Sequence, residues 1–191
     1  MLKKKILLLD NHDSFTYNLV QLVEQYQKHD LITCKTDEIE LDTIKQFDKI
    51  LISPGPGIPN QIENLQHIMD KYAKTKDFLG ICLGHQALAE YFGATLQQMP
   101  KPIHGGKKAI SMIQNDIIFK DIPQHTHVGL YHSWRVASEN LPDALQVTAI
   151  SSDGVIMAFK HRNYQVRGVQ FHPESIITTE GKKMIFNWLS A

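Results

Sequence analysis

A cysteine stands between two glycines in the stretch Gly-Ile-Cys-Leu-Gly-His-Gln, residues 80–86, where it could act as a nucleophile. Small residues two positions before and after a reactive side chain permit the sharp strand-to-helix turn of a nucleophile elbow. A helix that begins at Leu83 would place the sulfur of Cys82 at a positive helix end, which favours the thiolate. A free cysteine is more often a small buried hydrophobic residue, so the assignment depends on other residues.

A histidine and a glutamate near the end of the chain could activate that cysteine. Residues 171–174 read Phe-His-Pro-Glu and close a β-like run. In an extended segment, side chains two positions apart point to the same side, so Glu174 can orient the imidazole of His172. His172 could then take a proton from Cys82 and later return one to a leaving group, as a general base and acid do in acyl transfer.

A turn rich in proline and glycine could stabilise the negative charge that develops in such a reaction. Residues 53–57 read Ser-Pro-Gly-Pro-Gly and follow a predicted strand. Proline has no N–H to offer, whereas the N–H of Gly55 or Gly57 could join that of Leu83 in an oxyanion hole. Alone the motif indicates only a turn, but with Cys82 and His172 it completes a nucleophile, a base and electrophilic donors.

The composition indicates one domain, residues 1–191, that has no strongly charged partner. The chain has 191 residues, 42% of them hydrophobic, and its 20 basic and 20 acidic residues balance. This size suits one core, and the charge balance gives no reason to expect nucleic acid or an anionic membrane as partner. The two cysteines, Cys34 and Cys82, suit neither a disulfide framework nor a zinc site and favour a reducing cytosol. We therefore expect a cytoplasmic protein without a metal or another cofactor.

The first ten residues combine lysines with an apolar run, as a signal peptide does. The run is too short for that role, and we expect it to form the first buried strand. No stretch of the sequence has enough consecutive apolar residues for a membrane span.

Apolar runs alternate with amphipathic segments in the first half of the chain, which predicts parallel strands joined by helices. The runs expected to form buried strands are 6–9, 31–34, 50–52 and 78–82. We expect Ser14 to cap a helix after the first strand and Asn60 to cap a helix before the fourth. Doubly wound sheets bind ligands beyond the carboxyl ends of their strands. The loops expected at those ends are 10–14, 53–57 and the turn around Cys82.

From about residue 94 the strand-like segments follow one another closely, which is typical of antiparallel pairing. These segments are 108–113, 128–133, 145–151, 155–159 and 165–171, and a helix is expected at 181–189. The predicted fold is therefore α/β, with a doubly wound, mostly parallel central sheet flanked by helices and an additional antiparallel region in the C-terminal half.

Together these motifs resemble class I glutamine amidotransferases. Four stretches carry the resemblance in the family's order: 53–57 (Ser-Pro-Gly-Pro-Gly), 80–86 (Gly-Ile-Cys-Leu-Gly-His-Gln), 131–133 (Tyr-His-Ser) and 168–175 (Gly-Val-Gln-Phe-His-Pro-Glu-Ser). The resemblance spans nearly the whole chain. Residues 10–21, Asp-Asn-His-Asp-Ser-Phe-Thr-Tyr-Asn-Leu-Val-Gln, are similar to the opening of the small subunits of anthranilate synthase and aminodeoxychorismate (p-aminobenzoate) synthase.

The resemblance implies a reaction and the residues that perform it. Cys82 would attack the side-chain amide of L-glutamine to give a γ-glutamyl thioester and ammonia, and His172 and Glu174 would complete the triad. Gln86 lies one helical turn beyond Cys82 and so faces the same pocket. The family's glutamine contacts fall on Gly55, Gly57, Leu83, Gln86, Ser133 and Trp134.

The resemblance also implies a partner, a large subunit that aminates chorismate with this ammonia and on which the glutaminase activity depends. We expect residues 11–15, beside the predicted site, to form part of that interface. The sequence departs from the family at three places. His12 replaces a usual tyrosine, Trp134 replaces a usual leucine, and Gly106 is an additional residue in Ile-His-Gly-Gly-Lys, where Met-His-Gly-Lys is usual.

Other functions stay open. A free-standing thiol hydrolase would work at full rate without a partner, and a catalytically silent subunit would only bind. The intact Cys82, His172 and Glu174 argue against the silent subunit. The sequence does not separate a partner that makes anthranilate from one that makes aminodeoxychorismate. We expect Cys34 to lie in the core, and the histidines expected to be surface or packing residues are His104, His125, His127, His132 and His161.

Overall fold

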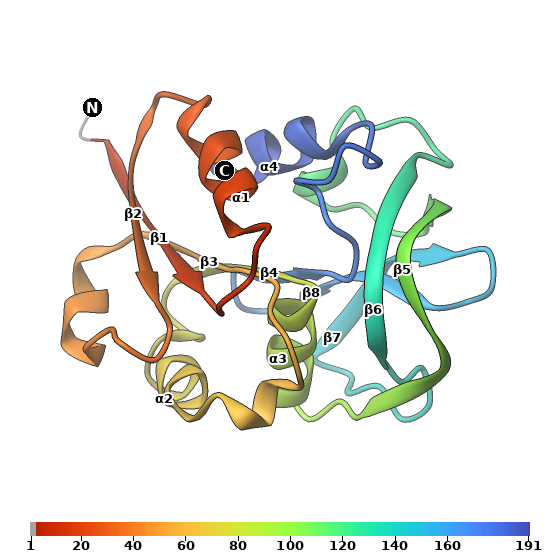
Figure 1. The fold of residues 1–191 in the computed structure, drawn as a ribbon, viewed down its shortest axis with the longest axis horizontal. Helices are drawn as coiled ribbons and strands as arrows, with labels where there is room; N and C mark the ends of the chain where they lie inside the picture. Colours follow the sequence, from red (N-terminus) through yellow and green to blue (C-terminus); the bar gives the residue numbers. More distant parts are fainter. Residues whose placement is uncertain (1–2) are drawn as a thin grey trace.

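The computed structural model describes residues 3–191, and Figure 1 shows them as a sheet with helices on both faces. Within these residues the sheet has nine strands in the order β2-β1-β3-β4-β9-β8-β7-β5-β6. The first five of that order are parallel. Their bounds are β1 (Lys4–Asp10), β2 (His29–Lys35), β3 (Lys49–Ile52), β4 (Asp77–Ile81) and β9 (Val166–Val169).

The other four strands pair antiparallel and extend the sheet on one side. They are β8 (Ile156–His161), β7 (Leu145–Ser151), β5 (Leu96–Met112) and β6 (His127–Val136). The predicted α/β fold with an antiparallel C-terminal region is therefore confirmed. The strand predicted at 108–113 is only the end of β5, which begins at Leu96 because its first part already pairs with β6.

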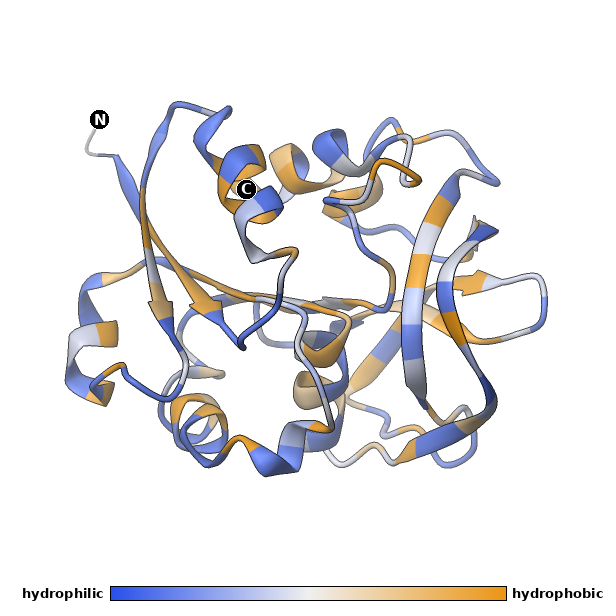
Figure 2. Ribbon diagram, viewed as in Figure 1, coloured by the Kyte–Doolittle hydropathy of each residue, from blue (hydrophilic) through white to orange (hydrophobic). Residues whose placement is uncertain are grey.

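The part of the chain that the structure describes has four α-helices, and they divide between the two faces of the sheet (Figure 1). They are α1 (Thr16–Glu24), α2 (Glu63–Tyr72), α3 (Leu83–Tyr91) and α4 (Gly181–Ser190), and short 3₁₀ turns cover Leu41–Gln46, Pro59–Gln61 and Ile117–Phe119. In β1, Ile6 and Leu8 pack with α1 and α4, whereas Leu7 and Leu9 pack with α2 and α3. Figure 2 shows the resulting apolar colouring of the sheet and of the helix faces that cover it. The alternation explains why an uninterrupted apolar run forms a strand that is buried on both sides.

Both predicted helix caps are wrong. Helix α1 begins at Thr16, not after Ser14, because Asp10 accepts from the Thr16 hydroxyl (2.7 Å) and Asp13 accepts from the Phe15 N–H (2.8 Å). These two carboxylates serve the start of the helix in place of the serine. Asn60 lies in a 3₁₀ turn, and α2 starts only at Glu63.

Strand β2 exists as predicted, but it is not buried. It pairs only with β1, at the edge of the sheet, and Ile32 is 48% exposed. Cys34 is half-buried and packs at the margin of the core rather than inside it. An apolar run alone does not distinguish an edge strand from a central one.

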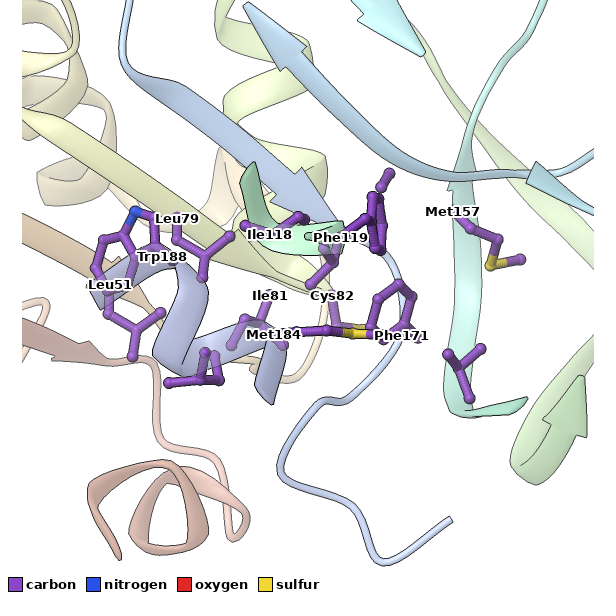
Figure 3. Packing of buried hydrophobic residues seen from close by; sticks show 14 of the residues in the cluster. Leu51, Leu79, Ile81, Cys82, Ile118, Phe119, Met157, Phe171, Met184 and Trp188 are labelled. Atoms are coloured by element: carbon purple, nitrogen blue, oxygen red, sulfur yellow. The ribbon is translucent and has the colours of Figure 1, made fainter. Parts of the chain in front are cut away.

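A buried ion pair ties the end of α4 to the edge of the sheet where the parallel strands begin. Lys49, whose side chain is 2% exposed, contacts the Asp77 carboxylate and donates to the carbonyl of Trp188 (3.0 Å). The Trp188 indole donates to Asp77 (2.9 Å), and the Lys49 ammonium lies 4.9 Å from its ring centroid. Figure 3 shows Trp188 packed beside Leu51 and Leu79. The ion pair therefore joins three segments that are far apart in the sequence.

We expect Lys49→Met to lower the free energy of unfolding by about 3 kcal/mol, because the carboxylate of Asp77, whose side chain is only 16% exposed, would lose its main partner. The double variant Lys49→Met/Asp77→Asn removes both charges and should recover part of that loss. Urea unfolding followed by circular dichroism measures both values. A double variant no more stable than Lys49→Met would show that the unpaired charge is not the cause.

Candidate active site

The carboxyl ends of β1, β3, β4 and β9 lie side by side, and the segments that follow β3 and β4, together with β5 and β6, line one small cavity. Its volume is about 180 Å³, and all six predicted glutamine contacts line it together with Cys82. Larger hollows of about 520 and 700 Å³ lie elsewhere, and no cysteine lines either of them. The residues that line the cavity are Gly55, Pro56, Gly57, Cys82, Leu83, Gln86, His104, Tyr131, His132, Ser133 and Trp134.

Cys82 occupies a strained turn between β4 and α3. Its φ is +50° and its ψ −98°, a conformation that non-glycine residues rarely adopt. A Cβ on Gly80 would lie 2.3 Å from the backbone of Gly84, and one on Gly84 would lie 2.7 Å from the carbonyl oxygen of Ile52. Both positions therefore require glycine. The Cys82 N–H donates to Val169 (2.8 Å), which anchors the turn to β9.

His172 and Glu174 form a buried pair beside this turn. Nδ1 of His172 lies 2.6 Å from a carboxylate oxygen of Glu174, and the side chains are 3% and 0% exposed. Because a carboxylate only accepts, Nδ1 carries the hydrogen and Nε2 is the nitrogen left for chemistry. The rings of Phe15 and Tyr131 pack edge-on against the imidazole, with centroids 5.7 and 5.0 Å away. The pair is thus fixed in orientation from two sides.

The backbone around His172 is also held in place. Its N–H donates to Gly129 of β6 (3.0 Å), and its carbonyl accepts from the Thr178 hydroxyl (2.5 Å). The short bridge between His172 and Gly129 links the end of β9 to the antiparallel region. The base is therefore positioned by both parts of the sheet.

The electrostatics of the pair favour a charged imidazole. Burial alone would lower the pKa of His172, but hydrogen bonding with Cys82 and Glu174 and the charges of both groups outweigh it and raise the pKa to about 10. Nε2 has no partner at full hydrogen-bond geometry among the described residues. The effect of Cys82 on the pKa places it next to the imidazole, although the two groups do not form a hydrogen bond of full geometry, as is common in enzymes without substrate.

A glutamine that the sequence analysis did not single out contacts the cysteine sulfur. Gln170 is fully buried, and its Nε2 donates to Sγ of Cys82 (3.6 Å). Its Oε1 accepts from Nε2 of Gln86 (3.2 Å), which also donates to the carbonyl of Trp134 (2.8 Å). The donor side of the predicted glutamine contact Gln86 is therefore engaged within the protein. The sequence contained a signal for this contact. Gln170 stands two residues before His172 in the same extended run, so the two side chains point to the same side.

The loop after β1 supports the proline-glycine turn. Asn11 is buried; its N–H donates to the Ser53 hydroxyl and its side-chain amide to the Ser53 carbonyl, each at 2.9 Å. The Thr36 hydroxyl in turn donates to the Asn11 oxygen (2.7 Å). Gly55 and Gly57 then extend into the cavity wall. The loop 11–15 thus contacts both sides of the cavity, through Asn11 and through Phe15.

The three departures from the family pattern have local explanations. The additional glycine produces a β-bulge, in which His104 pairs with Tyr131 and Gly106 with Leu130, so Gly105 has no partner across the ladder. Gly105 has a φ of +77°, which suits glycine. The bulge leaves His104 in the cavity wall.

Of the other two departures, one lies in the cavity wall and one outside it. Trp134 lines the cavity, and its carbonyl accepts from Gln86 and from His132 (2.8 Å each). His12 has a φ of +59° and lies 3.1 Å from both oxygens of Asp37 on the surface. Its partner comes from the chain after β2, so the substitution is accommodated outside the cavity.

The histidines expected to be surface or packing residues include two in the cavity wall. His104 is exposed there, whereas His132 is buried and burial lowers its pKa. His161 is buried and accepts from two backbone N–H groups at the end of β8. Residues 3–191 contain no group of three or more His, Cys, Asp or Glu side chains arranged for a metal ion. Among the same residues, no helix is long and apolar enough to cross a membrane.

Comparisons with known proteins identify the family. The family model of class-I glutamine amidotransferases matches residues 7–191. A Haemophilus influenzae protein provisionally named anthranilate synthase component II is 41% identical over 187 residues, covering 97% of this chain and 96% of that protein. Anthranilate synthase component 2 of Porphyra purpurea is 39% identical over 189 residues, covering 97% and 99%.

A solved structure agrees with the sequence relatives. A crystal structure from Thermoplasma acidophilum, provisionally described as one component of a GMP synthase, matches with a TM-score of 0.88 at 25% identity. The match covers 100% of this chain and 94% of that one. The chain is an enzyme of the class I glutamine amidotransferase family.

Proposed function

We propose that this enzyme hydrolyses L-glutamine to glutamate at Cys82 and delivers the ammonia to a large subunit that aminates chorismate, as component II of anthranilate synthase. The observation that carries the proposal is the strained Cys82 turn, which opens into a cavity beside the His172–Glu174 pair. The names of the relatives from Haemophilus and Porphyra favour the anthranilate branch. The alternative is the glutaminase subunit of aminodeoxychorismate synthase, or one subunit that serves both.

The chemistry follows from the geometry. The Cys82 thiolate attacks the side-chain amide carbon of glutamine, and N–H groups of Leu83 and of the proline-glycine turn receive the negative oxygen. Nε2 of His172 gives its proton to the nitrogen as the C–N bond breaks, which releases ammonia and leaves a γ-glutamyl thioester. Water then attacks the thioester, His172 takes a proton from it, and the C–S bond breaks to release glutamate.

The cavity walls suit the rest of the substrate. Gly55 and Gly57 of the proline-glycine turn and Ser133 and Trp134 of β6 line the cavity. Gln86 also lines it, and its amide is held by Trp134 and Gln170. A small polar cavity with few orienting groups is typical of a site for one small ligand.

The proposed partner would cover the mouth of the site. Two large apolar side chains are exposed close to the catalytic loops: Tyr17 at the start of α1 (74%) and Ile176, two residues after Glu174 (98%). Exposed apolar residues next to a site indicate a contact surface more often than isolated ones do. A contact with the proposed large subunit would bury these two side chains.

The aromatic product that the protein helps to form identifies which large subunit is its partner. We expect the protein to make anthranilate when it is mixed with an anthranilate synthase large subunit, chorismate and glutamine, as measured by chromatography. Aminodeoxychorismate formed with the other large subunit would support the alternative branch. Glutamine hydrolysis at the same rate without either partner would contradict the proposed dependence on a large subunit, in favour of a free-standing hydrolase.

Cys82→Ala should abolish product formation from glutamine and leave product formation from added ammonium salts intact, because only the nucleophile is removed. Cys34→Ala is a matched control that removes the other thiol and should retain both activities. Glutamate release by the Cys82→Ala variant in the presence of the partner would show that another residue is the nucleophile.

Glu174→Gln should shift the alkaline limb of kcat/KM to lower pH. Burial already lowers the pKa of His172, and the Glu174 carboxylate is one of the two groups that raise it to about 10, so removing this charge lowers it. The imidazolium that protonates the leaving nitrogen is then lost at a lower pH. Removing the imidazole altogether, in His172→Ala, should reduce kcat by about 10³-fold. An unchanged alkaline limb in Glu174→Gln would contradict the role given to this pair.

A further inference from the structure

We propose that Gln170 is a fourth catalytic group, which stabilises the thiolate of Cys82 through a hydrogen bond to its sulfur. The inference rests on the proposed function, because it assigns Gln170 a part in the same reaction. Its basis is the buried contact of 3.6 Å between Nε2 of Gln170 and Sγ of Cys82. No other side-chain N–H or O–H group in residues 3–191 meets full hydrogen-bond geometry with that sulfur.

The amide of Gln170 is fixed so that its donor faces the sulfur. Its oxygen accepts from Gln86 (3.2 Å), so the NH₂ group must point the other way, toward Cys82. The backbone N–H of Gln170 donates to Met157 of β8 (2.9 Å), which holds the residue at the end of β9. Because the side chain is fully buried, water cannot replace the bond.

The charge of the sulfur changes during the reaction, and the bond responds to it. A neutral amide donates a stronger hydrogen bond to a thiolate than to a thiol or a thioester sulfur. The contact therefore favours the thiolate before attack and again when the C–S bond breaks and the thiolate leaves. Gln170 does not line the cavity, so it acts on the sulfur and not on the bound substrate.

Two substitutions separate this role from a structural one. Gln170→Met keeps the length of the side chain and loses both the donor to Cys82 and the acceptor for Gln86. Gln170→Glu keeps an acceptor for Gln86 and, in its ionised form, has no donor. Thr148→Val is the control. Thr148 lies in β7, outside the site, and its fully buried hydroxyl has no hydrogen-bond partner within residues 3–191.

The measurement is the pH dependence of iodoacetamide alkylation at Cys82, followed by peptide mass spectrometry so that Cys34 does not interfere. Both Gln170 variants should react about tenfold more slowly than the wild type at neutral pH, with the midpoint about one pH unit higher. The difference in alkylation rate between Gln170→Met and the wild type should shrink at high pH, where the thiolate forms without the hydrogen bond from Gln170. Thr148→Val should match the wild type.

Three results would overturn the proposal. The first is an unchanged midpoint in Gln170→Met. The second is slow alkylation in Gln170→Met with a normal rate in Gln170→Glu, which would show that the effect comes from the hydrogen bond that Gln170 accepts from Gln86. The third is a deficit that persists at high pH, which a packing defect would produce. Alkylation needs neither glutamine nor a partner, so these results are independent of whether the glutaminase assignment holds.

In the glutaminase assay, Gln170→Glu, which keeps the acceptor for Gln86, should lower kcat by about tenfold and change KM for glutamine by less than about twofold, because the lost donor contacts the sulfur and not the substrate. A rise in KM with unchanged kcat would assign Gln170 to substrate binding instead. Absence of glutaminase activity in the wild type with both partners would count against the proposed function alone.

Discussion

The close approach of α3 to the strands beneath it is the constraint on which the site depends. Helix α3 starts directly after β4, and no side chain fits between its first turn and the backbones of β3 and β4. Residue 82 therefore takes a backbone conformation that costs energy for any residue with a side chain. The packing of α3 against its strands must outweigh this cost. In return the sulfur is held at a helix start with almost no freedom of position.

Much of the fold and part of the site could be predicted because they depend on local patterns. The apolar runs, the paired glycines and the alternation in His-Pro-Glu each carry their meaning over a few residues. The helix caps could not be predicted, because the groups that serve the start of α1 are aspartates placed by the end of β1. The exposure of β2 depends on strand order, which local patterns do not encode.

The site residues that escaped prediction act through tertiary contacts. Phe15 and Tyr131 are placed against the imidazole by α1 and β6, which meet only in the folded chain. Gln86 was expected to face the pocket, and it does, but its donor is occupied by a carbonyl from β6 and by Gln170. A sequence pattern indicates which side chains can reach a site and not which hydrogen bonds they make there.

The bulge at Gly105 has a consequence for how the cavity wall can vary. In a regular ladder an inserted residue would turn every later side chain of β5 to the opposite face. Here the extra residue is accommodated at one point, and the pairing resumes with Gly106 opposite Leu130 and continues to Ala109 opposite His127. The pocket wall can therefore gain or lose one residue, while each later side chain of β5 stays on the same face of the sheet. Such a joint lets a binding site diverge between relatives without redesign of the core.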